Sequence, residues 1–473
     1  MKNNIFLMLF ILVGFGFAQV SVKNINEEFS KGNFKKVEEL INKKLSENNV
    51  SSEEKLDLEY KKDLMQRIRL DFKRSEEDVI KALKKYYPDI TSKDLVKWEK
   101  DKSLEMMYID GEKKYFNSAV PNLFRKNKEA RLQREKIDGL TVNKGNEFLS
   151  KFLPQEVSDK KSKGEFQPIK MRLKYTVTLK KNIVPEGEII RAWLPYPKEG
   201  YENQRNVKMI NVNDDKYLIA DNDALQRSIY IEKKVVKDED LKFYVEYEFD
   251  SYSDWKNLKA DDVKDYNKNS EIFKKYTVEE KPHIVFTDKI KKLSQEINGN
   301  ETNPYNKVVK IVEWITINIP WTSAREYSTL ENIPDYCLSN MQGDCGIKSL
   351  LFITLARCAG IPAKWQSGWM LHPYTVTMHD WAQVYFENIG WVHVDPDFGI
   401  QPTEDVDVRN FYTNGMDPYR LIVNDDIAIP LYPAKIYPRS EPYDFQRGEL
   451  EWRGGNLYFD KWNYNMDVEY VKN

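Results

Sequence analysis

Apolar residues recur every three or four positions through a Lys- and Glu-rich N-terminal region, residues 19–165, and this spacing predicts amphipathic helices. Segments 34–45, 58–72 and 79–86 mark three of them. Their many charges fit the solvated faces of surface helices. The stretch FSKGNFKKVEELI is similar to one unit of a helical repeat. No second copy follows at a fixed period, so a solenoid is not predicted.

A strand pattern replaces the helical spacing over residues 166–255. Apolar and polar residues alternate in MRLKYTVTLKK, EIIRAWLPYP and LKFYVEYEF, which is typical of half-buried antiparallel strands. Pro185, Gly187 and Gly200 separate these runs as turns. We therefore expect a β-sandwich domain here, then a polar linker. Helical spacing returns in a third domain, residues 270–400.

One helix in that third domain is apolar on every side. The stretch GDCGIKSLLFITLARCAGIPAKW contains no proline between Cys345 and Ala359, and nearly all of its residues there are apolar. Such a helix is normally buried inside a domain. Asp344 stands where an N-cap is expected, and Gly360 suits the position after the last turn. Cys345 is thus predicted in the first turn of a central helix.

A cysteine in a first helical turn is placed for nucleophilic chemistry. The unpaired amides and the helix dipole favour negative charge there, so we expect a lowered thiol pKa. The same amides can hydrogen-bond an oxyanion. The alternatives for Cys345 are a structural thiol or a disulfide with Cys337. Cys358, near the other end of the helix, is expected to be a core residue.

A histidine and a carboxylate follow in the predicted hairpin MHDWAQVYFENIGWVHVDPDFG. A loop with an odd number of residues would put His379 and Asp395 on one face of the two strands, and a two-residue turn would separate them. His393 shares a strand face with Asp395 and is the main competitor. Asp380 points to the opposite face from His379, which makes it a poor group to orient the imidazole.

Together these fragments resemble the transglutaminase-like superfamily, a branch of the papain-like cysteine enzymes. The similarity rests on G-D-C opening the helix, R-C-A-G-I-P-A closing it, H-D-W and G-W-V-H-V-D-P, and covers roughly residues 306–399. It implies an α+β fold in which the central helix packs on an antiparallel sheet, preceded by the β-sandwich and the helical region. It also implies roles for Cys345 as nucleophile, His379 as general base and acid, and Asp395 as the residue that orients the imidazole.

The resemblance implies two auxiliary residues and no cofactor. Trp321 is the candidate for an aromatic that supports the oxyanion hole, and Gln383 stands where the family often has Glu. No run of acidic residues has the pattern of a calcium loop, so no metal is expected.

Composition and the N-terminus limit partners and location. Lys and Arg (73) nearly balance Asp and Glu (75), so nucleic-acid binding is not expected. Residues 1–18 combine Lys2, an apolar run and small residues before Gln19, which predicts a cleaved signal peptide and an exported, periplasmic or extracellular protein. The alternative is an uncleaved membrane anchor. Oligomeric state is left open by the sequence.

The C-terminal segment, residues 401–473, is rich in Tyr, Trp and turn residues. We expect a β-rich extension packed on the catalytic core. For the whole chain, we expect an enzyme that attacks amide or peptide bonds of a protein or peptide through an acyl-thioester. A protease or amidase is favoured over a crosslinking enzyme. The alternative is a non-catalytic binding or scaffold protein that retains the fold.

Overall fold

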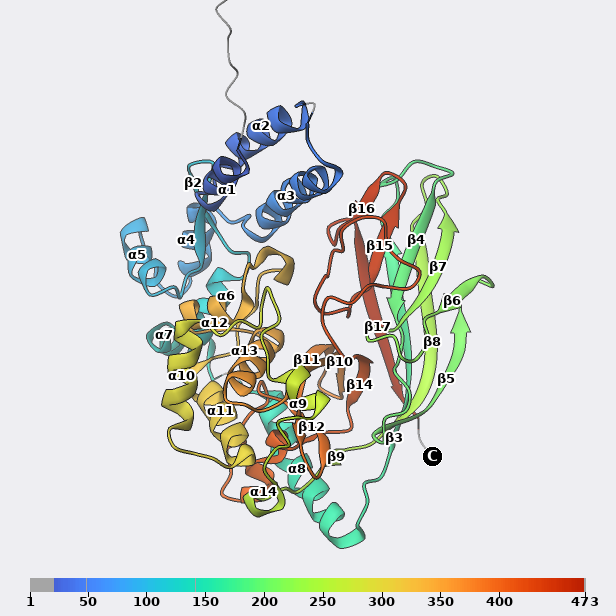
Figure 1. Cartoon of the computed structure of the whole chain (residues 1–473). Coiled ribbons are helices and arrows are strands. Elements are labelled where there is room, and N and C mark those ends of the chain that lie inside the picture. Colours follow the sequence, from blue (N-terminus) through green and yellow to red (C-terminus); the bar gives the residue numbers. More distant parts are fainter. Residues whose placement is uncertain (1–20, 48, 141, 472–473) are drawn as a thin grey trace, which may run out of the picture. The chain divides into compact units, whose positions relative to one another are not determined.

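The computed structural model describes residues 21–47, 49–140 and 142–471 (Figure 1). The predicted signal peptide, residues 1–18, lies outside this range. The chain divides into two compact units, the first made of residues 1–79 and 105–117 and the second of residues 80–104 and 118–473. No helix in the described part of the chain combines the length and the apolar character needed to cross a membrane.

The first unit contains helices and one hairpin. Its elements are α1 (Val22–Ser30), α2 (Phe34–Leu45), α3 (Ser52–Asp71), β1 (Met106–Ile109) and β2 (Glu112–Tyr115). The Ser51 side chain caps α3 by accepting a hydrogen bond from the Glu54 amide at 3.0 Å. The sequence analysis missed the hairpin, although its Asp110-Gly111 turn, with φ of 52° and 82°, is a strong hairpin signal.

The second unit begins within the predicted helical region. It takes the end of α4 (Glu76–Leu83), α5 (Ser92–Lys100), α6 (Ala119–Lys126), α7 (Lys128–Asp138) and α8 (Lys144–Lys163). One side of α8 buries Leu149, Leu153 and Val157 in an apolar cluster with residues far along the chain, among them Phe411 and Tyr412. The charged region 19–165 is therefore not one domain, because its last helix shares a core with the second unit.

Two antiparallel sheets form the predicted β-sandwich (Figure 1). Their orders are β17-β3-β8-β5 and β16-β15-β4-β7-β6. The strands are β3 (Ile169–Leu179), β4 (Ile189–Pro195), β5 (Gln204–Val212), β6 (Tyr217–Ile219), β7 (Ser228–Lys234), β8 (Leu241–Ser251), β15 (Glu449–Trp452), β16 (Gly455–Leu457) and β17 (Trp462–Tyr470). In β3 and β8 alternate residues are buried, as the sequence pattern predicts.

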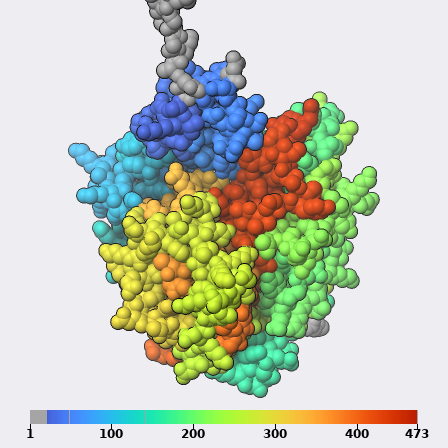
Figure 2. Space-filling view, viewed as in Figure 1, coloured from blue at the N-terminus to red at the C-terminus, as the bar shows by residue number. Residues whose placement is uncertain are grey.

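The C-terminal extension is divided between two of the predicted domains. Its strand β14 (Arg420–Asn424) pairs with β10 (Ala363–His372) of the third domain, whereas its last three strands complete the sandwich: β17 pairs with β3 along its whole length, and β15 pairs with β4. Figure 1 shows these strands in red among the green ones. In Figure 2 the red segment lies between the green sandwich and the yellow helical part of the second unit. Residues 166–255 alone would leave both sheets incomplete.

In the third predicted domain, a layer of helices packs against an antiparallel sheet whose strands lie in the order β12-β11-β10-β14. The strands are β10 (Ala363–His372), β11 (Thr375–Phe386), β12 (Gly390–Val394) and β14 (Arg420–Asn424). The helices are α9 (Glu271–Tyr276), α10 (Asp288–Asn298), α11 (Pro304–Asn318), α12 (Ile333–Asn340) and α13 (Cys345–Cys358). Two-stranded β9 (Asp254–Trp255) and β13 (Gly415–Met416) and the short α14 (Val406–Arg409) complete the unit.

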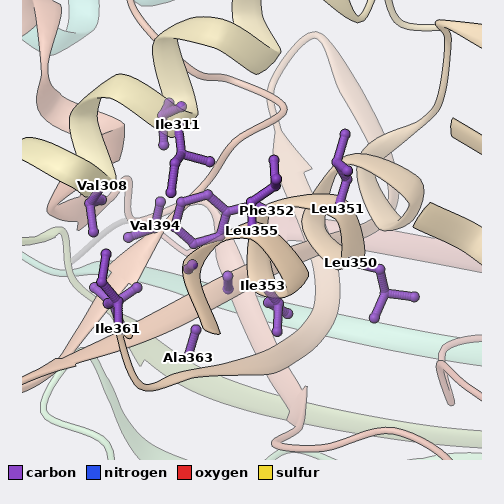
Figure 3. Close-up of a cluster of buried hydrophobic side chains, with 14 of the residues drawn as sticks. Val308, Ile311, Leu350, Leu351, Phe352, Ile353, Leu355, Ile361, Ala363 and Val394 are labelled. Atoms are coloured by element: carbon purple, nitrogen blue, oxygen red, sulfur yellow. The ribbon is translucent and has the colours of Figure 1, made fainter. Parts of the chain in front are cut away.

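Helix α13 is buried at the centre of this domain, as its composition predicts. Figure 3 shows its side chains on several sides of the helix, together with Val308 and Ile311 of α11 and Val394 of β12. Full burial of one such aliphatic side chain contributes about 1.5–3 kcal/mol. A helix that buries most of its residues is thereby fixed in position, and so is the cysteine at its first residue.

Candidate active site

Cys345 begins α13 and lines a cavity of about 250 Å³. Asp344 caps the helix: its carboxylate accepts hydrogen bonds from the Ile347 amide at 3.1 Å and the Tyr327 hydroxyl at 2.7 Å. Gly346 leaves room for these groups, since a Cβ there would lie 2.2 Å from the Tyr327 oxygen. Cys337, Cys345 and Cys358 are all free, so the alternative of a Cys337–Cys345 disulfide is not realised.

The sulfur of Cys345 contacts a carboxylate. Its thiol donates to Asp380 Oδ2 at 3.4 Å, and Asp380 Oδ1 accepts from the Gln446 amide group at 2.6 Å. Burial, followed by the nearby charges of Asp380 and Asp344, raises the pKa of the Cys345 thiol well above its usual value. The sequence analysis expected the helix terminus to lower this pKa. Tertiary burial and two carboxylates outweigh the helix dipole, so the thiol keeps its proton.

His379 and Asp395 form a buried pair, with 2.7 Å between His379 Nε2 and Asp395 Oδ2. The loop between β11 and β12 has an odd number of residues, because Phe386 pairs with Gly390. The side chains of His379 and Asp395 therefore project from the same face of the sheet. They are diagonal neighbours on adjacent strands and do not lie directly opposite each other. Burial favours the neutral acid, but the charges of His379 and Arg420 outweigh it and lower the pKa of Asp395.

Arg420 is a member of this cluster that the sequence analysis missed. Its guanidinium lies 3.1 Å from Asp395 Oδ2 and 2.8 Å from Asp417 Oδ2, and it stacks on the Phe398 ring at 4.6 Å. Asp417 is also 3.0 Å from His372 Nε2 and accepts from the Tyr412 hydroxyl at 3.0 Å. No sequence signal marks Arg420, because β14 pairs with β10, a strand almost fifty residues earlier in the chain.

The strand β11 divides the candidate residues between the two faces of the sheet. Asp380 points toward α13 and Cys345, as do the buried Ala382 and Val384. His379 projects from the opposite face. Among the described hydrogen bonds none joins Cys345 to His379, and the cavity is lined by the neighbours of His379, Met378 and Asp380, rather than by its ring.

The two auxiliary candidates are placed differently. Trp321 lines the cavity with Cys345, and a bridge to Gly343 holds it beside the start of α13. Its indole is 43% exposed and lies under the guanidinium of Arg125 on α6, at 4.6 Å. Gln383 lies away from the cavity, where its amide group is 3.1 Å from His393 Nε2.

The other histidines have partners of their own. His393 Nδ1 is 2.7 Å from Asp254 Oδ2. Burial would raise the pKa of that carboxyl, but His393 and Lys256 lower it to about 2. His283 is fully buried and accepts a hydrogen bond from the Ile333 amide at 3.1 Å, and burial lowers its pKa to about 4. In the described part of the chain, no group of three His, Cys, Asp or Glu residues is arranged to hold a metal ion.

Residues 291–396 match the family model of the transglutaminase-like superfamily, and this segment lies in the α+β domain that contains Cys345 and His379. A curated relative is the uncharacterized protein YebA of Bacillus subtilis (strain 168), with 25% identity over 131 residues. The match covers 24% of this chain and 18% of YebA, so the chain spans less than a fifth of that relative.

Two solved structures are also similar. One is described as a "putative cysteine protease" from Cytophaga hutchinsonii, with 17% identity and a TM-score of 0.42, covering 64% of this chain and 90% of that one. The other is the periplasmic domain of TgpA from Pseudomonas aeruginosa, with 14% identity and a TM-score of 0.27, covering 49% and 88%.

Proposed function

We propose that this protein is an exported cysteine-nucleophile enzyme that cleaves amide or peptide bonds of a protein or peptide substrate through an acyl-thioester. One observation carries the proposal: Cys345 opens a buried helix at a solvent-reachable cavity, and the β11–β12 hairpin that follows in the chain carries the buried His379–Asp395 pair. The superfamily match of residues 291–396 supports it. Export is proposed on the sequence of residues 1–18.

In the proposed reaction, Cys345 attacks the substrate carbonyl carbon and His379 accepts the thiol proton. The carbonyl oxygen takes the negative charge, which free amides at the start of α13 stabilise. His379 then protonates the leaving amine as the C–N bond breaks, which leaves the acyl-thioester. Water, deprotonated by His379, attacks the thioester and releases the acid and the thiol. Trp321 is proposed to line the acyl site beside the oxyanion.

This reaction requires a rearrangement of the sulfur. The Cys345 thiol must leave the Asp380 carboxylate, and the imidazole must come within hydrogen-bond reach when substrate binds. Asp395 supports the imidazole, because its negative charge stabilises the ring when it becomes protonated, and the positive charge of Arg420 keeps Asp395 ionised.

The alternative is a binding or scaffold protein that retains this fold without turnover. The contact of the sulfur with a carboxylate, instead of an imidazole, favours it. Alkylation by iodoacetamide at pH 7, followed by peptide mass spectrometry, separates the two. Cys358 is partly exposed, and burial also raises the pKa of its thiol, so it provides a second thiol outside the cavity as an internal control in the same chain.

Two variants should change the alkylation of Cys345 in opposite directions. Asp380→Asn removes the charge that raises the thiol pKa, so alkylation should be faster. His379→Asn removes the proposed proton acceptor, so alkylation in the presence of substrate should be slower. If Cys345 reacts no faster than Cys358 in every variant and with every substrate, the scaffold function replaces the enzymatic one.

The group that accepts the acyl chain from the thioester, water or an amine, is tested separately. A glutamine-rich protein is incubated with the enzyme and a primary amine, and the products are analysed by mass spectrometry. We expect cleaved peptides or deamidated glutamine, since water is in vast excess. Amine adducts would establish crosslinking instead, and products that persist in Cys345→Ala would refute the mechanism.

A further inference from the structure

The cavity beside Cys345 carries more acidic than basic groups. Five carboxyl groups and two guanidinium groups line it: Glu326, Asp344, Asp380, Glu441 and Asp444, with Arg325 and Arg447. An excess of carboxyl groups in a confined space favours a cationic ligand over a neutral or anionic one. The question is which of these charges is already neutralised within the protein.

Three of the carboxyl groups have strong partners. Arg447 lies between Glu326, with two hydrogen bonds of 3.0 and 2.6 Å, and Glu441, with one of 2.8 Å. Its guanidinium is therefore committed to two carboxylates and also lies over the Phe459 ring. Asp344 caps α13. None of these three acids is free to bind a ligand without losing an existing contact.

Asp380 and Asp444 are different. Asp380 accepts only from neutral groups, the Gln446 amide and the Cys345 thiol. Asp444 is 6% exposed and lines the cavity, and its own backbone amide is the hydrogen-bond donor described for it. Within the described part of the chain, no ion pair involves either carboxyl group. Burial, followed by the neighbouring carboxyl groups, raises the pKa of both.

We propose that this cavity binds a protonated primary amine on the acyl part of the substrate, with Asp444 and Asp380 as its counter-ions. The proposal rests on the proposed function, because it places the amine next to the carbonyl that Cys345 attacks. The cavity volume of about 250 Å³ accommodates an aminoalkyl chain. The amine can be the α-amine of an N-terminal residue or the side-chain amine of a lysine. Both are primary ammonium groups with three donors.

Binding of such a cation would also prepare the nucleophile. The ammonium offsets the negative potential of Asp380, which together with burial holds the proton on Cys345. It also replaces the thiol as the hydrogen-bond donor to Asp380 Oδ2. The sulfur is then released from Asp380 for the rearrangement that the proposed reaction requires, and a substrate that carries the cation favours this state over one that does not.

The test measures cleavage by the full chain of the coumarin amides of lysine, Nα-acetyl-lysine, Nε-acetyl-lysine and Nα-acetyl-norleucine. We expect kcat/KM to be higher for an amine-bearing substrate than for norleucine with a blocked amine by about tenfold or more, as for a hydrogen bond to a charged group. The two singly acetylated substrates show whether the α-amine or the side-chain amine is bound. In Asp444→Asn the preference should fall about tenfold, whereas Asp215→Asn, an exposed carboxylate of the sandwich, should leave it unchanged.

The outcomes separate this proposal from the proposed function. Equal rates for charged and blocked substrates, all abolished by Cys345→Ala, would overturn the amine site and leave the enzyme intact. If no amide is cleaved, calorimetry with Cys345→Ala compares lysinamide with acetyl-norleucinamide. Preferential binding of lysinamide that is lost in Cys345→Ala/Asp444→Asn supports the site, and equal or absent binding overturns it. Circular dichroism checks that each variant is folded.

Discussion

Arg420→Met tests whether the buried charges behind His379 form one unit. Arg420 is 1% exposed, and so is Asp395, while Asp417 is fully buried. Removing one partner from a buried ion pair costs about 3–5 kcal/mol, because it leaves an uncompensated charge. Here Asp395 keeps His379, and Asp417 keeps His372 and Tyr412. We therefore expect a loss at the lower end, about 3 kcal/mol in the free energy of unfolding.

The assay is urea unfolding at pH 7 monitored by tryptophan fluorescence. Methionine retains most of the aliphatic volume that packs on Phe398, so the loss of unfolding free energy in Arg420→Met measures mainly the removal of the positive charge. Asp395 and Asp417 have lowered pKa values, so their stabilisation is present above about pH 4 and is lost as the pH falls through their folded-state pKa values. Adding Asp417→Asn to Arg420→Met should recover part of the stability. A loss below about 1 kcal/mol with an unchanged m-value would refute the reasoning.

Three further predictions concern stability. The buried His283 accepts a hydrogen bond from the Ile333 amide, and its pKa of about 4 lies below that of a histidine in the unfolded chain. Protonation of His283 therefore favours the unfolded chain, and wild type should lose about 2 kcal/mol of unfolding free energy through this group between pH 7 and pH 5. Urea titrations of His283→Asn should lack that part of the loss. Gly368→Ala would put a Cβ 1.8 Å from the Leu421 carbonyl oxygen, so we expect β10 and β14 to separate and the variant to unfold at lower urea, by about 3 kcal/mol; an unchanged midpoint would contradict this. Leu153→Ala on α8 should cost about 2–5 kcal/mol by the same assay, since Leu153 is buried in a cluster with Phe411 and Tyr412 within the second unit, and a smaller cost would show that α8 is detachable.

Local sequence signals predict the parts of the site that depend on neighbours in the chain. Asp344 as N-cap, the buried helix from Cys345 and the turn at Gly360 follow from composition and capping preferences, and the structure has all three. The facing side chains of His379 and Asp395 follow from strand alternation once the loop length is known.

The features that the sequence analysis missed depend on distant parts of the chain. Arg420 reaches Asp395 from a strand at the other side of the sheet, and the thiol pKa is set by burial and by Asp380, not by the helix terminus. The pairing of β17 with β3 joins Trp462 to Leu179, and no alternation pattern specifies a partner so far away. The alternation of apolar and polar residues shows which face of a strand is buried, but it does not show with which other strand it pairs.

That pairing has a consequence for how the protein is made. A ribosome emits β3 almost three hundred residues before β17, and β8 about two hundred residues before it, so until then β3 has a bare edge over residues 171–179. An unprotected edge of this kind recruits strands from other chains. Nascent or prematurely terminated chains should therefore depend on chaperones or on an export machinery that keeps them unfolded, whatever the function of the finished protein.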